Sequence, residues 1–283
     1  MAKKKNNIGP VVAHFWIYVF LILLAILSIL PFWVMFMNGT RSTPEINANS
    51  LGLLPSKYIK LNWDIVMSKS FDAMTGFVNS LIVSSGATVL SVYFSAMTAY
   101  SIVAYRWKLR RAFFTFIMAV LMVPSQIVSI GFYQMIYSVG LNNNFIPLIL
   151  PAIASPAVVF YMKQYMAPAL PLEIVQAARI DGAGEFFTFN RIVIPIMKPA
   201  IATQAIFAFV NKWNELFVPS VLLTETKKFT MPMMVSLLKG DIYKKELGSI
   251  YLGLSLTVLP LFIVYFLLSK YIIAGVALGS VKG

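Results

Sequence analysis

The sequence of 283 residues contains no cysteine, a single histidine and few charged side chains. The absence of cysteine excludes disulfides, thiol nucleophiles and zinc–thiolate sites. One histidine cannot form a metal cluster, and we interpret His14 as an interfacial residue at the start of the first apolar run, not as a catalytic group. The pattern GxxxxGK[ST] of a phosphate-binding loop is also missing, so this chain is not expected to hydrolyse ATP or to carry a cofactor of its own.

Charge is scarce and apolar residues dominate. Charged residues make up 12% of the chain, hydrophobic residues 59%, and the mean hydropathy is +0.79. This composition is typical of a protein in a lipid bilayer and excludes an ordinary soluble domain. The net charge of +13 comes from short basic tracts beside apolar runs and forms no continuous face. We therefore expect contact with anionic lipid headgroups and not with nucleic acid.

Six apolar runs predict six membrane helices, because each can cross a hydrocarbon core of about 30 Å. They cover residues of about 14–37, 76–104, 113–137, 145–165, 200–223 and 249–270. The first run is too long for the apolar core of a signal peptide, about 7 to 15 residues. No internal repeat is present, which argues against two fused halves. The sequence predicts one all-α membrane domain over residues 1–283.

Basic residues orient the predicted bundle. Lys3, Lys4 and Lys5 precede the first run, and the densest basic cluster lies at 106–111, between the second and third runs. The positive-inside rule places both in the cytoplasm, and an even number of spans returns the C-terminus to the same side. The predicted outer loop at about 224–247 runs against this rule, since it contains lysines at 227, 228, 244 and 245. It could dock a partner protein. The first outer loop, about 38–75, could cap the bundle or contact a partner.

Individual runs differ in character. The second contains many small residues, which is typical of close helix packing inside a bundle: Ser80, Ser84, Ser85, Gly86, Ser91, Ser95 and Ala96. The third is interrupted at Pro124-Ser125-Gln126, where a freed carbonyl group favours a kink that lines a cavity. Gln126 is therefore a candidate pathway residue. The fourth contains Pro147, Pro151 and Pro156, which predict an irregular helix.

The fifth run contains polar residues near its middle: Asn211, Lys212, Trp213, Asn214 and Glu215. A charged group at that depth costs about 2.5 to 3.5 kcal/mol on insertion scales, so these side chains should face a cavity or one another. Two interpretations stay open. Lys212, Trp213, Asn214 and Glu215 could line a translocation pathway or its gate. Alternatively, Lys212 and Glu215, three residues apart on one helix, could only neutralise each other.

The longest charged segment between apolar runs extends from Pro171 to Pro199. It predicts a helix of about three turns that starts at Pro171, followed by a turn at 182–184 where glycine permits positive φ. A second helix is expected from Glu185 to Ile192, before Pro195 breaks it. Alanines on the first helix would allow the backbone of a partner to approach closely. We call this helix-turn-helix segment, residues 171–199, the knuckle.

The knuckle resembles the cytoplasmic EAA loop of ABC importer permeases, whose pattern is Glu-Ala-Ala, three residues, Gly, nine residues, Ile, one residue, Leu-Pro. Every spacing is kept here, with Gln176 in place of Glu and Ile194 in place of Leu. A plain interfacial loop with a turn glycine is the alternative. The resemblance implies a cytoplasmic coupling loop over about 166–199 and assigns contact with an ATPase to the following residues: Gln176, Ala177, Ala178, Asp181, Gly182, Ile192 and Pro195.

Further segments are similar to the carbohydrate-importer branch of these permeases: Asn79-Ser80-Leu81, Trp213-Asn214-Glu215, Met231-Pro232 and the closing GVALGSVKG. The resemblance implies the type I importer fold and a multi-pass subunit of a bacterial cell membrane. It further implies a second homologous permease subunit, two ATP-binding cassette subunits that hold ATP and magnesium, and an extracellular solute-binding protein. The cargo would be a carbohydrate, with an oligosaccharide expected.

Other functions compete with this one. An ion-driven secondary transporter would need intramembrane acids and commonly shows repeated halves, and Glu215 alone is thin support for it. An intramembrane enzyme would need a base near a nucleophile within the spans, for which the sequence offers no candidate pair. An ABC importer permease for a non-sugar solute is also possible. ATP-dependence of uptake would separate these functions.

Overall fold

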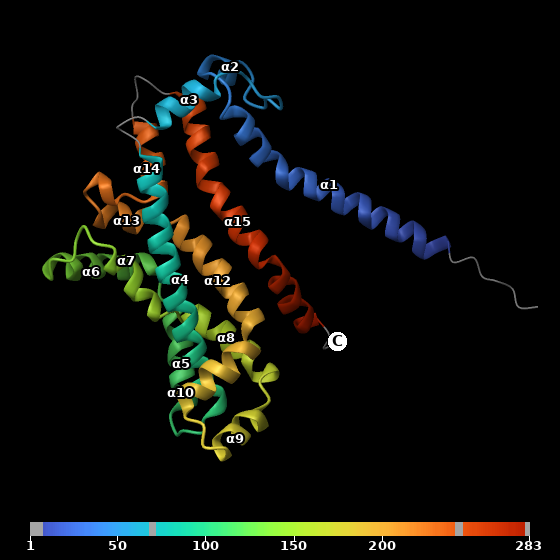
Figure 1. Cartoon of the computed structure of the whole chain (residues 1–283), viewed down its shortest axis with the longest axis vertical. Coiled ribbons are helices and arrows are strands. Elements are labelled where there is room, and N and C mark those ends of the chain that lie inside the picture. Colours follow the sequence, from blue (N-terminus) through green and yellow to red (C-terminus); the bar gives the residue numbers. More distant parts are fainter. Residues whose placement is uncertain (1–7, 68–71, 241–245, 281–283) are drawn as a thin grey trace, which may run out of the picture. The chain divides into compact units, whose positions relative to one another are not determined.

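The computed structural model describes residues 8–67, 72–240 and 246–280, and all regular secondary structure in these ranges is helical (Figure 1). The predicted all-α class is confirmed. The chain divides into two compact units, Met1–Phe71 with Leu237–Leu256 and Asp72–Ser236 with Thr257–Gly283. Two of the three boundaries between the units fall within helices, α14 (Met231–Gly240) and α15 (Leu247–Ser280). A single permease domain over the whole chain stays a prediction.

Four helical segments of the described ranges are long and apolar enough to cross a membrane: His14–Asn38, Ala73–Ala104, Ile146–Ala169 and Leu247–Leu267. A fifth span results if Glu185–Ile196 and Lys198–Trp213, which meet at a bend of 82°, count as one. These segments correspond to the first, second, fourth and sixth predicted spans. Of the bent pair, Lys198–Trp213 overlaps the fifth predicted span, whereas Glu185–Ile196 belongs to the knuckle. A count of six spans is not reached by this criterion.

The third predicted span contains no helix that is long enough to cross a membrane. It consists of α5 (Arg110–Val120) and α6 (Ser125–Ser138), and Pro124 lies between them with an extended backbone, φ −61° and ψ 125°. Neither helix approaches the roughly 20 residues that a crossing needs. The predicted interruption at Pro124 is confirmed. The predicted fifth span is also divided, because α12 (Lys198–Trp213) and α13 (Phe217–Leu222) are separated by residues 214–216.

Helix α4 (Ala73–Ala104) is the packing centre of the second unit, where α8 (Pro156–Ala169) and α12 lie against it (Figure 1). Small residues on α4, including Ser84, Ser95 and Ala96, are fully buried. The prediction of an interior helix is therefore confirmed. Its core includes Met162 of α8 and Met197 at the start of α12. Short side chains on α4 leave the room that these longer ones fill.

The fourth predicted span is irregular, as its prolines indicate. It consists of α7 (Ile146–Ile149), a 3-10 turn (Leu150–Ile153) and α8. Each of the three elements has a proline in its first turn, where the missing N–H group breaks no helical hydrogen bond. The prolines thus restart the helix at intervals and do not merely kink it.

The second predicted outer loop contains a helix that the sequence analysis did not anticipate. After a 3-10 turn (Thr226–Lys228), α14 begins at Met231, whose N–H group donates to Ser80 Oγ at 2.8 Å. Asn79 Nδ2 donates to the carbonyl groups of Lys227 and Phe229, both at 2.9 Å. The predicted outer loop at 224–247 therefore contains regular structure, because α4 supplies the polar partners that fix the start of α14. Lys244 and Lys245 lie outside the described residues.

In the first unit, α1 (Ile8–Asn38) leads into a compact segment with two short helices, α2 (Thr43–Ala48) and α3 (Ile59–Val66). Arg41 Nη1 donates to Asn38 Oδ1 at 3.1 Å and to the Asn49 carbonyl at 2.7 Å. Asn62 Nδ2 donates to the carbonyls of Gly39 and Arg41 at 2.9 and 3.0 Å. Within the predicted first outer loop, residues 38–62 are thus joined to one another by hydrogen bonds.

Candidate functional site

The turn of the knuckle has the predicted backbone. Helix α9 (Leu172–Ile180) ends at Asp181, and Gly182 follows with φ +77°. The Gly182 N–H group donates to the Arg179 carbonyl at 3.1 Å, and the Ala183 N–H group donates to the Ala178 carbonyl at 2.9 Å. These two bonds form a Schellman motif, which satisfies carbonyl groups at the end of a helix. The positive φ that the sequence predicted at this turn is confirmed.

The second helix of the knuckle does not break at Pro195, which corrects the sequence prediction. Helix α10 (Glu185–Thr188), a π turn (Phe189–Val193) and α11 (Ile194–Ile196) run on without interruption, and the 82° bend follows Ile196. In the π turn the Ile194 N–H group donates to the Phe189 carbonyl. A wider turn at this point accommodates Pro195, which lacks an N–H group and would crowd a regular helix.

A cluster of charged and aromatic side chains joins the two helices of the knuckle to the end of α4. Arg179 Nε donates to Glu185 Oε1 at 2.6 Å, and the Tyr100 hydroxyl donates to Glu185 Oε2 at 3.2 Å. The Arg179 guanidinium lies 4.8 Å from the ring centre of Tyr105. The hydrogen bond to Glu185 raises the pKa of Arg179, which stays a cation. Sequence reasoning did not single out Arg179, Glu185, Tyr100 or Tyr105, because only the fold brings them together.

Most residues that the EAA resemblance assigns to coupling are accessible. Gln176, Ala177, Asp181, Gly182 and Pro195 are exposed, Ile192 is half-buried, and Ala178 is buried. Beside them, Ile180 is 87% exposed and Phe186 is 71% exposed. Large apolar side chains so fully exposed at a helical turn are typical of a surface that another protein covers.

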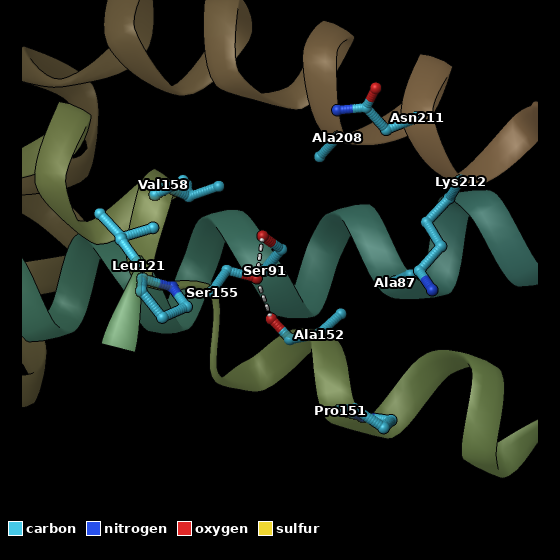
Figure 2. Close-up of a pocket in the computed structure, with 12 residues that line it drawn as sticks. Ala87, Ser91, Leu121, Pro151, Ala152, Ser155, Val158, Ala208, Asn211 and Lys212 are labelled. Atoms are coloured by element: carbon cyan, nitrogen blue, oxygen red, sulfur yellow. Dashed lines mark hydrogen bonds between the residues drawn. The ribbon is translucent and has the colours of Figure 1, made fainter. Parts of the chain in front are cut away.

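Lys212 and Glu215, from the end of α12, form an ion pair with Nζ and Oε2 2.7 Å apart. Their side chains keep 28% and 26% of their surface exposed. Lys212 lines two cavities of about 380 and 860 Å³, and Glu215 lines the larger one. Figure 2 shows the Lys212 side chain extending from α12 toward α4, where Ala87 lies. The two side chains therefore neutralise each other and also line accessible space. Their role in a pathway or gate stays a prediction.

The wall of the smaller cavity contains polar groups that the sequence analysis did not connect. Ser91 Oγ donates to Ser155 Oγ at 2.9 Å, and Ser155 Oγ donates to the Ala152 carbonyl at 2.7 Å (Figure 2). Asn211 of α12 lines the same cavity. Hydroxyl and amide groups on a mostly apolar wall suit a ligand that is recognised by hydrogen bonds.

Trp213 is placed differently from its neighbours. Its side chain is fully buried, and Nε1 donates to the Thr257 carbonyl at 2.9 Å. The indole stacks on Phe209 with ring centres 5.5 Å apart. Within the described residues, Trp213 belongs to the packing between helices and not to the walls of the two cavities. Its role in a pathway stays a prediction.

The other pathway candidates divide between exposed and undescribed positions. Asn214, the C-terminal cap of α12, is exposed. Gln126 is the second residue of α6, and its side chain is outside the described part of the structure. In the ranges that the structure describes, no group of three or more histidine, aspartate and glutamate side chains could hold a metal ion.

The family of this chain follows from its sequence. The family described as "Binding-protein-dependent transport system inner membrane component" matches residues 91–277, and the chain belongs to it. This is a family of transport permeases of the inner membrane, whose members work with a solute-binding protein. The chain is therefore a multi-pass cell-membrane protein.

Relatives cover nearly the whole chain. The sequence is 32% identical to the arabinooligosaccharides transport system permease protein AraQ of Halalkalibacterium halodurans, over 92% of this chain and 93% of the relative. It is 31% identical to the lactose transport system permease protein LacG of Rhizobium radiobacter, over 94% and 95%. A crystal structure of a bacterial ABC transporter involved in alginate import matches with a TM-score of 0.77 and 20% identity, covering 96% of this chain and 99% of that one. This last likeness shows the fold.

Proposed function

We propose that this chain is a membrane-spanning permease subunit of an ATP-driven ABC importer, that its cargo is a carbohydrate, and that an oligosaccharide is the expected form. The observation that carries the proposal is the knuckle. An EAA-type segment with a Schellman turn exposes Gly182, Ile180 and Phe186 at the far end of the helices that also form the Lys212 cavities. The relatives named for arabinooligosaccharide and lactose transport support a carbohydrate cargo.

The knuckle is proposed to dock on an ATPase subunit through its exposed face. Movement of that subunit would displace α9, and the Arg179–Glu185 ion pair would pass the displacement to α10 and, through Tyr100, to α4. Because α10, the π turn and α11 are continuous, a displacement of α10 would be transmitted along them toward α12. Such a chain of packed elements can bias two arrangements of the cavity between α4, α8 and α12.

The cavity walls are proposed to form this subunit's half of the translocation pathway. Lys212, Glu215 and Asn211 offer charged and amide groups, and Ser91 and Ser155 offer hydroxyl groups. Sugars are bound by hydrogen bonds to such groups, which supports this assignment. Asn214 and Gln126 are included as gate candidates because they flank the helix breaks after α12 and before α6.

The assembly that we propose has a second homologous permease subunit, two ATP-binding cassette subunits that bind ATP and magnesium, and an extracellular solute-binding protein. Both ends of this chain and the knuckle would be cytoplasmic, as the basic cluster at 106–111 indicates. The turn at 142–144 would then face outward.

Uptake by the reconstituted complex tests the proposal. The chain is co-purified with its partner subunits, placed in proteoliposomes, and supplied with the binding protein and labelled arabinooligosaccharides or lactose. We expect uptake that requires ATP inside the vesicles and persists when ion gradients are collapsed. Uptake driven by an ion gradient without ATP would overturn the ABC function. ATP-driven uptake of a non-sugar solute alone would overturn the carbohydrate cargo.

A further inference from the structure

A third cavity, of about 660 Å³, lies between the end of α4, the start of α5 and the inner face of α9. Its charged lining residues are Arg106, Arg110 and Arg179, all cations. No carboxylate side chain belongs to this lining, which consists entirely of described residues. Three guanidinium groups around one hollow create a strongly positive potential and favour an anion inside it.

The guanidinium groups retain hydrogen-bonding capacity. Arg179 uses Nε for Glu185, whereas its buried Nη2 has no hydrogen-bond partner in the described residues. Arg110 Nη1 donates to the Tyr105 carbonyl at 3.3 Å, so the other nitrogens of that fork are available. A guanidinium donor without a partner favours binding of an oxyanion, which would supply the missing acceptor. Arginine forks match the geometry of phosphate oxygens.

Gln176 faces the same cavity. In the EAA pattern that this segment resembles, glutamate stands at this position, and its carboxylate would offset the three guanidinium groups. The amide of Gln176 carries no charge, so it does not offset Arg106 and Arg110, and Glu185 is the carboxylate that pairs with Arg179. The amide can also donate a hydrogen bond to an anion, which a carboxylate cannot do.

The depth of the cavity in the membrane is indicated by its neighbours. Its lining includes Val103 and Ala104, the last two residues of the span formed by α4. Tyr105 contributes to its wall, and Trp107, two residues on, donates its Nε1 hydrogen to the Ser101 carbonyl at 3.1 Å. Tyrosine and tryptophan at the end of a span are typical of the level of lipid headgroups. Basic pockets between helices at this level bind anionic headgroups.

We propose that this cavity is a binding site for the phosphate group of an anionic phospholipid headgroup. Arg106, Arg110 and Arg179 hold the phosphate oxygens, and Gln176 donates a further hydrogen bond. The site joins α9 to the start of α5 through a bound lipid, so the lipid composition of the membrane affects the position of the knuckle. This inference requires the membrane location of the chain and is independent of the cargo.

Native mass spectrometry of the assembled transporter, purified and exchanged into mixtures of phosphatidylglycerol and phosphatidylcholine, tests the site. The wild-type complex is expected to retain phosphatidylglycerol preferentially. Each guanidinium near an anionic surface contributes about fivefold in affinity, so Arg106→Gln with Arg110→Gln should weaken retention at least about fivefold. Gln176→Glu, nearly equal in volume, should do so as well, because it places a carboxylate beside the phosphate.

Matched controls remove charge outside the cavity. Lys108→Gln with Arg111→Gln changes the net charge as much as the double arginine variant, and Lys108→Gln alone changes it as much as Gln176→Glu. Retention equal to the wild type in both controls, with loss in the cavity variants, supports the site. Equal retention by the cavity variants and the wild type overturns it.

Two further outcomes identify a different occupant. If millimolar inorganic phosphate binds with the same residue dependence and phosphatidylglycerol is not enriched, the lipid assignment is overturned. If lipid is not enriched and the cavity variants instead release the ATPase subunits, a carboxylate of that subunit fills the cavity and the proposal fails. Loss of sugar uptake in a preparation that keeps the lipid pattern would count against the proposed function and leave this site standing.

Discussion

Gly182 has a backbone conformation that side chains disfavour, in a place with room for a side chain. Its φ is +77°, and no atom lies within 4 Å of an added Cβ. Substitution therefore acts through the backbone and not through a clash. A β-branched residue at such a φ costs at least about 1 to 2 kcal/mol, whereas asparagine tolerates it.

We predict that Gly182→Val releases the ATPase subunits or separates ATP hydrolysis from uptake, while Gly182→Asn keeps most of both. The reason is that only valine displaces the turn that presents Ile180 and Asp181. Gly184→Ala is the control, because Gly184 has φ −66° and equally open surroundings. Co-purification of the ATPase and uptake per ATP measure the effect. If Gly182→Val matches Gly184→Ala in both, the turn is not a coupling element.

At the Lys212–Glu215 pair, substitutions can remove the charges without leaving one of them unpaired, so an effect of charge on uptake can be distinguished from an effect on folding. Removing both charges with Lys212→Met and Glu215→Gln leaves no unpaired ion beside the cavities. We predict near-normal expression with uptake lowered about fivefold, the equivalent of about 1 kcal/mol from one lost hydrogen bond to the cargo. Glu215→Gln alone should lower expression too, because it leaves the half-buried Lys212 cation without its partner. Normal uptake by the double variant would show that the pair is only structural.

At the scale of elements, the knuckle depends on one ion pair between its two helices. Both partners are partly exposed, with 34% of the Arg179 and 46% of the Glu185 side chain accessible, so the pair contributes at most about 1 kcal/mol to stability. We expect the pair to matter more for function than for stability, because the same Glu185 carboxylate also accepts a hydrogen bond from Tyr100 and so links α9 and α10 to α4.

We predict that Arg179→Glu and Glu185→Arg each lower uptake per ATP, and that the double reversal restores much of it by re-forming the pair. Arg191→Glu reverses the charge at an exposed position in the π turn that follows α10. It is the control and should have little effect. Proteoliposome uptake and ATP hydrolysis are measured together for all variants. Additive losses in the double reversal would mean that the two side chains do not act through each other.

The sequence predicted elements where local chemistry decides them. Gly182, the interruption at Pro124 and the small residues of α4 are local signals, and the structure confirms all three. It could not predict that α14 starts where it does, because Asn79 and Ser80 lie some 150 residues earlier in the chain. The break after Ile196 in place of Pro195 likewise depends on a π turn that has no strong sequence signal.

The candidate site was predictable to a similar degree. Motif spacing selected knuckle residues that the structure shows to be mostly exposed, and the cost of charge in a membrane selected Lys212 and Glu215, which line a cavity. Their roles in coupling and in a pathway stay predictions. Trp213 could not be assigned in this way, because the same indole suits a sugar-binding wall or a helix interface, and only the hydrogen bond to the Thr257 carbonyl distinguishes them. The Arg179 cluster and the third cavity involve residues from α4, α5, α9 and α10, which no spacing in the sequence relates.

For the whole molecule, the untested prediction is the orientation in the membrane. The knuckle and the turn at 142–144 belong to the same unit. The knuckle lies at the C-terminal end of α4, where Figure 1 shows α9, whereas α7, which follows the turn, packs beside Val83 and Gly86 in the N-terminal half of α4. If α4 spans the bilayer, the knuckle lies at one side of the membrane and the turn lies nearer the other. Arg106 and Arg110 of the basic cluster at 106–111 line the third cavity together with α9, so the positive-inside rule predicts a cytoplasmic knuckle.

The chain contains no cysteine, so a single introduced cysteine reports its own position without background. Asn142→Cys is preferable to Asn143→Cys, because Asn143 has φ +55° and its side chain accepts hydrogen bonds from the N–H groups of Thr224 and Glu225. We predict that a membrane-impermeant maleimide labels Asn142→Cys in intact cells and labels Gly184→Cys only after the membrane is opened. Both positions are exposed, so burial does not explain a difference. The reverse pattern would invert the bundle, place the knuckle outside, and remove the access to cytoplasmic ATPase subunits on which the proposed function depends.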